Sequence, residues 1–88
     1  MSYQLFHSRE YCAVTFPSTH HALKAEKVLE AAGVDFLIIP VPRHISASCG
    51  LAVKIFCSAR DEVSRILQEA GVVVEGIYEV RRQEGDDV

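Results

Sequence analysis

The chain has 88 residues, 49% of them hydrophobic and 24% charged, which suits one small folded domain and excludes a disordered chain. Nine Lys and Arg residues stand against twelve Asp and Glu residues, giving a net charge of −3 and a pI near 5.7. That acidic balance removes the basic footprint of a nucleic-acid-binding protein, so no nucleic acid is expected as a partner.

Membrane, export and cofactor signals are also missing from the sequence. No stretch approaches the ~20 consecutive apolar residues that span a bilayer, and the first ten residues do not resemble a secretory signal. The three cysteines are an odd number without CxxC spacing, so we expect free thiols and a cytoplasmic protein. No glycine-rich phosphate loop is present, and no cofactor is expected.

The first half of the chain predicts a leader, a strand and a helix. Residues 1–10 are polar and weakly patterned, which favours a poorly ordered leader. The segment 11–16 is rich in β-branched and aromatic residues, as strands are. Ser18 and Thr19 are both good caps for a helix over residues 20–32, where apolar residues recur at helical spacing. Gly33 then stands where a left-handed residue ends such a helix.

The rest of the chain predicts a strand and a loop, followed by a second strand–helix–strand unit. Its predicted parts are a strand at 35–40, a loop at 41–50, a strand at 51–57, a helix capped by Ser58 and ended by Gly71, a strand at 72–80, and a charged, disordered tail at 81–88.

A weak internal repeat supports two similar halves. Residues 29–34 and 67–72 share the pattern L-x-x-A-G-V, and each copy closes a helix before a strand. The element order is therefore βαββαβ, which predicts an α+β, ferredoxin-like fold with a four-stranded antiparallel sheet and two helices on one face. A different α+β sandwich with the same element order is the main alternative.

This topology places the loop 41–50 beside the start of the first long helix, which makes Cys49 the most notable residue. A helix start carries free N–H groups and partial positive charge, and Arg43 on the same loop is a cation. Both would stabilise a reactive thiolate, and Gly50 would permit the backbone to aim the thiol into solvent. The alternative is that Cys49 is a small residue filling a turn.

The other two cysteines and the histidines have plainer interpretations. Strand parity turns Cys12 and Cys57 toward the helices, at the sheet end away from Cys49, as inert core residues. A metal site from His20, His44 and Cys49 would lack any ligand spacing, so a solvated helix start is the favoured role of the histidines. No metal is expected.

Several of these residues together resemble a known family, that of putative selenium/sulfur carrier protein-like domains, over roughly residues 11–80. The stretches that carry the resemblance are Phe16-Pro17-Ser18-Thr19-His20, Ala22-Leu23-Lys24-Ala25-Glu26 and Pro40-x-Pro42-Arg43-x-Ile45-Ser46-x-Ser48-Cys49-Gly50-Leu51-Ala52. The resemblance implies a single carrier-like domain over residues 11–80.

The resemblance also implies a function for the loop. Cys49 would accept a persulfide or selenopersulfide, and Arg43, Ser46, Ser48 and Gly50 would shape the loop around it. Ser18, Thr19 and His20 would face it from the helix start. The implied partners are proteins that donate and accept sulfur or selenium, and the implied role is a carrier more than a turnover enzyme.

Two other classes of function remain open at this point. One is a regulatory domain that binds a small molecule or anion at the first helix start. The other is an interaction module in which the loop is only structural. The rate of alkylation of Cys49 distinguishes the carrier from both.

The face of the sheet away from the helices predicts a homo-oligomer. Strand parity places few polar residues on this face. Its mainly apolar members are Tyr11, Ala13, Thr15, Leu37, Ile39, Ala52, Phe56 and Ile77. A small domain does not usually leave such a patch exposed. A homodimer would cover it, or residues 1–10 would fold across it within one chain.

Overall fold

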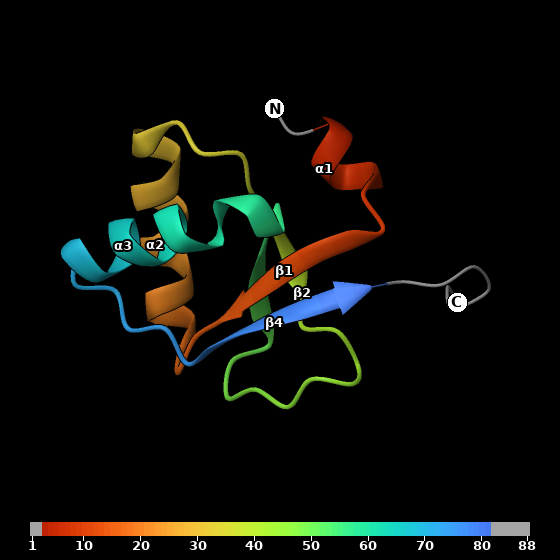
Figure 1. Ribbon diagram of the computed structural model, residues 1–88. Coiled ribbons are helices and arrows are strands. Elements are labelled where there is room, and N and C mark those ends of the chain that lie inside the picture. Colours follow the sequence, from red (N-terminus) through yellow and green to blue (C-terminus); the bar gives the residue numbers. More distant parts are fainter. Residues whose placement is uncertain (1–2, 82–88) are drawn as a thin grey trace.

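A computed structural model gives the structure of the protein and describes residues 3–81 (Figure 1). The predicted tail therefore lies, apart from Arg81, outside the described residues. The elements in chain order are α1 (Tyr3–His7), β1 (Glu10–Thr15), α2 (Thr19–Ala32), β2 (Leu37–Pro40), β3 (Leu51–Ile55), the short 3₁₀ helix η1 (Cys57–Ala59), α3 (Arg60–Glu69) and β4 (Gly76–Arg81).

The strands form one four-stranded sheet in the order β2-β3-β1-β4, and every neighbouring pair is antiparallel. The α+β class and the antiparallel sheet are thus confirmed. In the register of the sheet, Cys12 of β1 lies opposite Ile55 of β3 on one side and Glu79 of β4 on the other. β1 and β3 are the two central strands and contain most of the fully buried strand residues.

The long helix α2 begins and ends as its sequence predicts. The Ser18 side chain accepts a hydrogen bond from the His21 N–H, and Gly33 adopts a left-handed φ of 75°. The second L-x-x-A-G-V copy ends α3 in the same way, with Gly71 at φ 78°. In both copies the valine N–H donates to the leucine carbonyl, so the repeat encodes one helix-ending motif used twice.

Three predicted boundaries differ from the structure. No helix was predicted within residues 1–10, and α1 lies there. Ser58 does not cap α3, because the chain first winds into η1 and α3 begins after Ala59 without a side-chain cap. The last strand begins at Gly76 and not at residue 72, since the Val72 N–H is engaged in ending α3.

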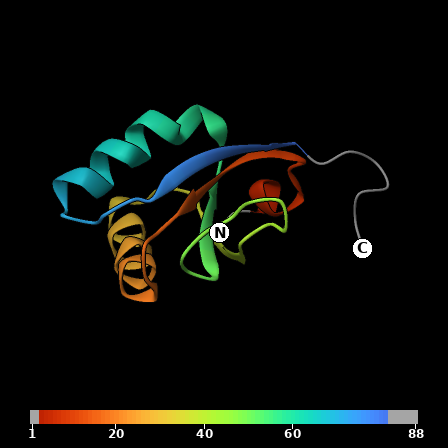
Figure 2. The ribbon, with the colours of Figure 1, turned by 90° about the horizontal axis from the view of Figure 1, so that it is seen from below.

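The main core lies between the sheet and the two long helices, which cover the same face (Figure 2). Parity in β1 is confirmed, because Cys12, Val14 and Phe16 all point into this core. Parity in β4 is corrected: Ile77 lies opposite Val14 and packs against the helix-side core, whereas it was expected on the other face. The error arose because alternation was counted from residue 72, whereas residues 72–75 do not belong to β4. Within residues 3–81, no helix combines the length and apolar character needed to cross a bilayer.

The opposite face of the sheet is partly covered by the chain itself, as Figure 2 shows for α1 and the loop 41–50. Leu5 of α1 is fully buried, and Ile45 of the loop packs with Tyr11 and Ala52 of the sheet. The buried Lys54 ammonium lies 4.5 Å from the Tyr11 ring centroid and donates to carbonyl groups at the end of α1. The leader therefore contributes to covering this face, the alternative to a dimer that the sequence left open.

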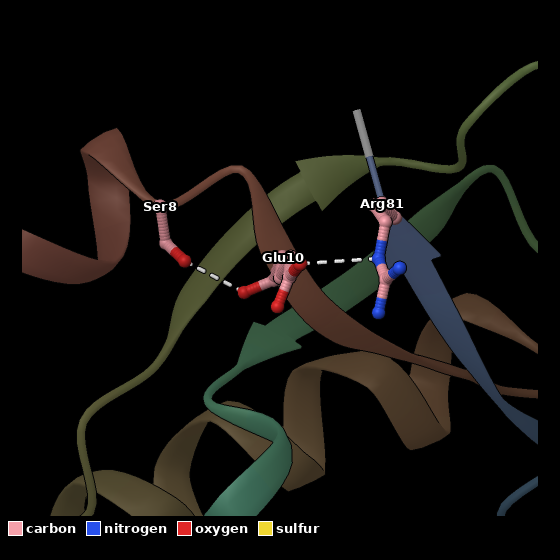
Figure 3. A network of polar contacts seen from close by, with 3 residues as sticks. All are labelled: Ser8, Glu10 and Arg81. Carbon is pink, nitrogen blue, oxygen red and sulfur yellow. Dashed lines mark hydrogen bonds and ion pairs between the residues drawn. The ribbon is translucent and has the colours of Figure 1, made fainter. Parts of the chain in front are cut away.

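An ion pair joins the outer ends of two strands (Figure 3). Glu10 begins β1 and lies opposite Arg81 of β4, with the Arg81 Nε 3.1 Å from a Glu10 carboxylate oxygen. The Ser8 hydroxyl donates to the Glu10 carbonyl at 2.6 Å. Both charged side chains are largely exposed, so the pair contributes little to stability.

Candidate functional site

The loop 41–50 bends around one end of the sheet, next to the start of α2 (Figure 1). The Val41 N–H donates to the Gly50 carbonyl at 3.1 Å and closes the base of the loop. Ile45 lies in the small core on one face of the sheet, while Cys49 belongs to the core on the helix face. The loop therefore crosses from one face to the other, and Cys49 enters the domain beside α2.

The Cys49 sulfur is surrounded by two hydrogen-bonding groups. The Leu51 N–H donates to Sγ at 3.4 Å, and the Thr19 hydroxyl lies 3.6 Å from Sγ. The expected meeting of the loop with the helix start is thus present in the structure. The expected exposure is wrong, because only 5% of Cys49 is accessible to solvent. The thiol packs inward against the core, and Gly50 does not have the left-handed backbone that would aim it outward.

Thr19 reaches Cys49 because of how α2 begins. Ser18 has an extended backbone and caps the helix, so Thr19 is its first residue, at the sheet end where the loop also lies. The Ser18 side chain is engaged with the His21 N–H and not with the loop. His20 is exposed and stacks edge-on against His21, with 5.6 Å between the ring centroids. Only Thr19 of these three thus contacts the cysteine.

The carboxylate of Glu75, the residue just before β4, holds the loop in place. The Ser48 N–H donates to Glu75 Oε1 at 3.1 Å, and the Ser48 hydroxyl donates to Oε2 at 2.6 Å. These two hydrogen bonds, the one from the Ser48 hydroxyl first, lower the pKa of Glu75 below its ordinary value of 4.5. The Glu75 N–H in turn donates to the Thr15 carbonyl at 2.7 Å, so the end of β1 positions the carboxylate.

Among the described residues, Arg43, Ser46 and Gly50 make no hydrogen bond to the Cys49 sulfur. Arg43 and His44 line a hollow of about 830 Å³ on the face of the sheet opposite the helices, together with Phe6 of α1. Ser46 is exposed on the loop. A side chain at Gly50 would meet open space, so sterics do not demand glycine there.

The other two cysteines, Cys12 and Cys57, lie next to each other. Cys12 is fully buried, as predicted, whereas Cys57 is only half-buried. Their sulfur atoms are 2.6 Å apart, and both cysteines are free. Both cysteines pack on the helix side of the sheet, as predicted, and the difference is that Cys57 lies at the edge of that core. In the described part of the chain, no three His, Cys, Asp or Glu side chains are grouped so that they could hold a metal ion.

Comparison with known proteins bears on this loop. The family described as "Putative Se/S carrier protein-like" matches residues 11–79, which include both helices, Cys49 and Glu75. The chain belongs to this family. This membership confirms the resemblance drawn from the sequence.

One curated relative is the "Uncharacterized protein YtiA" of Escherichia coli (strain K12), which is 31% identical over 52 residues. The aligned part covers 59% of this chain and spans 61% of the relative's length. No solved structure gives a significant match.

Sequence reasoning missed two groups at the site, the Leu51 N–H and Glu75. A backbone donor has no signal in a sequence pattern, since every residue other than proline supplies one. Glu75 would have been found from the register of β1 and β4, which brings the residue before Gly76 level with the end of β1. The prediction of a strand from residue 72 hid that relation.

Proposed function

We propose that this chain carries a sulfur or selenium atom as a persulfide or selenopersulfide on Cys49. The observation that supports this most directly is the pair of hydrogen-bonding groups at Sγ, the Leu51 N–H and the Thr19 hydroxyl. Hydrogen bonds to a charged acceptor are stronger than those to a neutral one, and both groups can donate to a thiolate. They would therefore stabilise the Cys49 thiolate, both when it attacks the donor protein and when it leaves as the carried atom is delivered.

The transfer balances without an external oxidant or reductant. The Cys49 sulfur, as a thiolate, attacks the outer sulfur or selenium of a persulfide on a donor protein. A bond forms between Cys49 and that outer atom while the donor's own bond to it breaks, and the donor leaves as a thiolate. Delivery to an acceptor protein repeats the exchange in the other direction, and Cys49 returns to its starting state.

The burial of Cys49 makes loop opening part of this proposal. At 5% exposure the thiol is reached only when the loop 41–50 moves away from α2. The Ser48–Glu75 contact restrains that movement, and it lies on the surface where a partner can displace it. The loop would thus keep a loaded sulfur away from free thiols until a partner binds.

Loading of the protein by a cysteine desulfurase with cysteine tests the proposal. Mass spectrometry of the protease fragments should show one added sulfur on the fragment that contains Cys49, and none in Cys49→Ser. Thr19→Val should deliver the added sulfur to an acceptor thiol roughly two- to tenfold more slowly, because one hydrogen bond to the leaving Cys49 thiolate is removed, and Thr19→Ser should restore the wild-type rate. Sulfur added to Cys57 instead would overturn the assignment.

For the fold, we propose the ferredoxin-like class within the α+β proteins. The order βαββαβ that follows α1 supports this, as does the placement of both long helices on one face. Comparison of an experimental structure with ferredoxin-like domains would test the assignment.

We also propose that the chain forms a homo-oligomer in the cytoplasm. The contact surface would lie on the sheet face opposite the two long helices, where α1 and Ile45 leave part of the sheet uncovered. That part is the hollow lined by Phe6, a residue that is 66% exposed. Sedimentation at micromolar concentration decides this point. A particle of 9.8 kDa would contradict it.

A further inference from the structure

The end of β3 far from Cys49 brings two thiols together. Cys12 lies within β1, and Cys57 is the first residue of η1, just after β3. Their sulfur atoms are 2.6 Å apart, a separation that approaches the ~2.05 Å of a disulfide bond. Cys49 lies before the other end of β3, with the five residues of that strand in between.

The path of the chain explains why the two thiols meet. Cys12 lies opposite Ile55, so residues 55 and 57 share the face on which Cys12 points. β3 ends at Ile55, and the chain then turns into η1, where the Ala59 N–H donates to the Phe56 carbonyl at 2.9 Å. This turn holds Cys57 beside β1. Backbone hydrogen bonds therefore help to place its side chain next to that of Cys12.

One of the two thiols can be reached from solvent. Cys57 is half-buried and borders a surface pocket of about 300 Å³, large enough for a small oxidant. Polar and charged residues surround this pocket, including the Glu10–Arg81 ion pair that Figure 3 shows. Cys12 lies behind Cys57 and is fully buried.

We infer that Cys12 and Cys57 form a reversible dithiol–disulfide site that reacts with small thiol oxidants such as hydrogen peroxide. The two sulfur atoms already lie 2.6 Å apart, so little further approach is needed to form the bond. The site is separate from the carrier role proposed for Cys49, and neither depends on the other.

The two cysteines have different roles in this reaction. Burial and, after it, the hydrogen bond to Cys57 together raise the pKa of the Cys12 thiol to about 12, so Cys12 keeps its proton. Cys57 therefore meets the oxidant first. Its sulfur, as a thiolate, attacks one peroxide oxygen and the O–O bond breaks. The departing hydroxide takes up the proton that the Cys57 thiol released, so a sulfenic acid and water result.

The second step closes the disulfide. The Cys12 sulfur attacks the Cys57 sulfur, the S–O bond breaks, and hydroxide leaves with the Cys12 proton as a second water. Together the two thiols lose two electrons and two protons, and the peroxide gains both. An external dithiol reverses the reaction by thiol–disulfide exchange.

Thiol counting after peroxide treatment tests the inference. The wild-type protein, oxidised in its folded state and then unfolded, should show its free thiols reduced from three to one. Non-reducing peptide mapping should join the fragments that contain Cys12 and Cys57, and dithiothreitol should restore all three thiols. Cys49→Ser should form the same cross-link, so failure of the carrier proposal leaves this result unchanged.

Two variants keep the test decisive. Cys57→Ser changes a half-buried position and should retain both remaining thiols at the same peroxide dose. Cys12→Ala should instead show Cys57 oxidised to sulfinic acid, because no neighbouring thiol traps the sulfenic acid. Three free thiols in the treated wild type, a cross-link to Cys49, or sulfinic acid on its Cys57 would each overturn the inference.

Discussion

The two ends of β3 each have a cysteine two residues away, and the two sulfur atoms meet different partners. At one end the Cys49 sulfur contacts a hydroxyl and a backbone N–H. At the other the Cys57 sulfur contacts another thiol. Polar donors favour a sulfur anion, whereas a neighbouring thiol can attack an oxidised sulfur and close a disulfide. The partner, and not the residue type, thus determines which chemistry each end supports.

The two ends also differ in how the sulfur is covered. Cys49 lies in the loop 41–50 and is almost fully buried, and the exposed Ser48–Glu75 contact holds this loop in place. Cys57 is half-buried and borders an open pocket, with its partner Cys12 in the core behind it. Access to Cys49 therefore depends on loop motion, while access to Cys57 depends only on the size of the reagent. Predictions that separate the two ends follow from this difference.

The largest expected effect is on stability at the Cys57 end. Cys12→Ala leaves a small cavity in the main core and should lower the free energy of unfolding by ~1–2 kcal/mol. Cys57→Ala removes a half-exposed sulfur and should lower it by about half as much or less. Urea unfolding of the reduced proteins measures both. Equal losses would show that the core does not treat the two thiols differently.

At the Cys49 end, Glu75→Ala should release the loop. Two hydrogen bonds to Ser48 are lost, and a buried thiol reacts only in molecules whose loop has opened. We expect iodoacetamide to label Cys49 roughly three- to tenfold faster than in the wild type, a modest change because the contact is exposed.

Glu30→Ala is the matched control for that experiment. Glu30 is an exposed carboxylate on α2, and its removal should leave the labelling of Cys49 unchanged. Labelling of Cys57 should also be the same in all three proteins, since its access does not involve the loop. Faster labelling of both cysteines in Glu75→Ala would mean that the whole domain, and not the loop, has been loosened.

The same contact should depend on pH in a defined direction. The pKa of Glu75 is lowered in the folded protein, so the contact is complete above the ordinary value of 4.5 and is lost as the pH falls through the lowered pKa. The carboxyl carbon resonance of Glu75 should titrate below pH 4.5 in the wild type. In Ser48→Ala the midpoint should rise toward 4.5, because the hydroxyl is the larger cause of the shift. Equal midpoints would remove the hydroxyl from the contact.

The elements that the sequence predicted well are those set by local chemistry. The Ser18 cap and the left-handed Gly33 are both present, and each acts within one turn of chain. The meeting of Thr19 with Cys49 was also predictable, because the order of strands and helices fixes which ends lie together. These inferences needed topology and local propensity alone.

What the sequence could not provide depends on register and on packing. Residues 72–75 are not part of β4, so alternation counted from residue 72 turned Ile77 to the wrong face and concealed Glu75. The direction of the Cys49 side chain depends on how the loop packs, which no local pattern encodes. The approach of Cys57 to Cys12 depends on η1, which replaced the end of a predicted strand.

The smallest expected effect concerns Arg43, which the sequence placed beside the thiol as its counter-ion. The structure places its side chain among the residues that line the hollow on the other face of the sheet, while the Cys49 sulfur contacts Thr19 and Leu51. Arg43→Ala should therefore leave the rate of Cys49 alkylation at a fixed pH unchanged to within about twofold. Thr19→Val, measured beside it, should alter the same rate because it removes a contact to the sulfur itself. A large effect of Arg43→Ala with none of Thr19→Val would mean that the reactive form of the loop turns Cys49 toward Arg43, and the two donors seen at Sγ would then describe only its resting form.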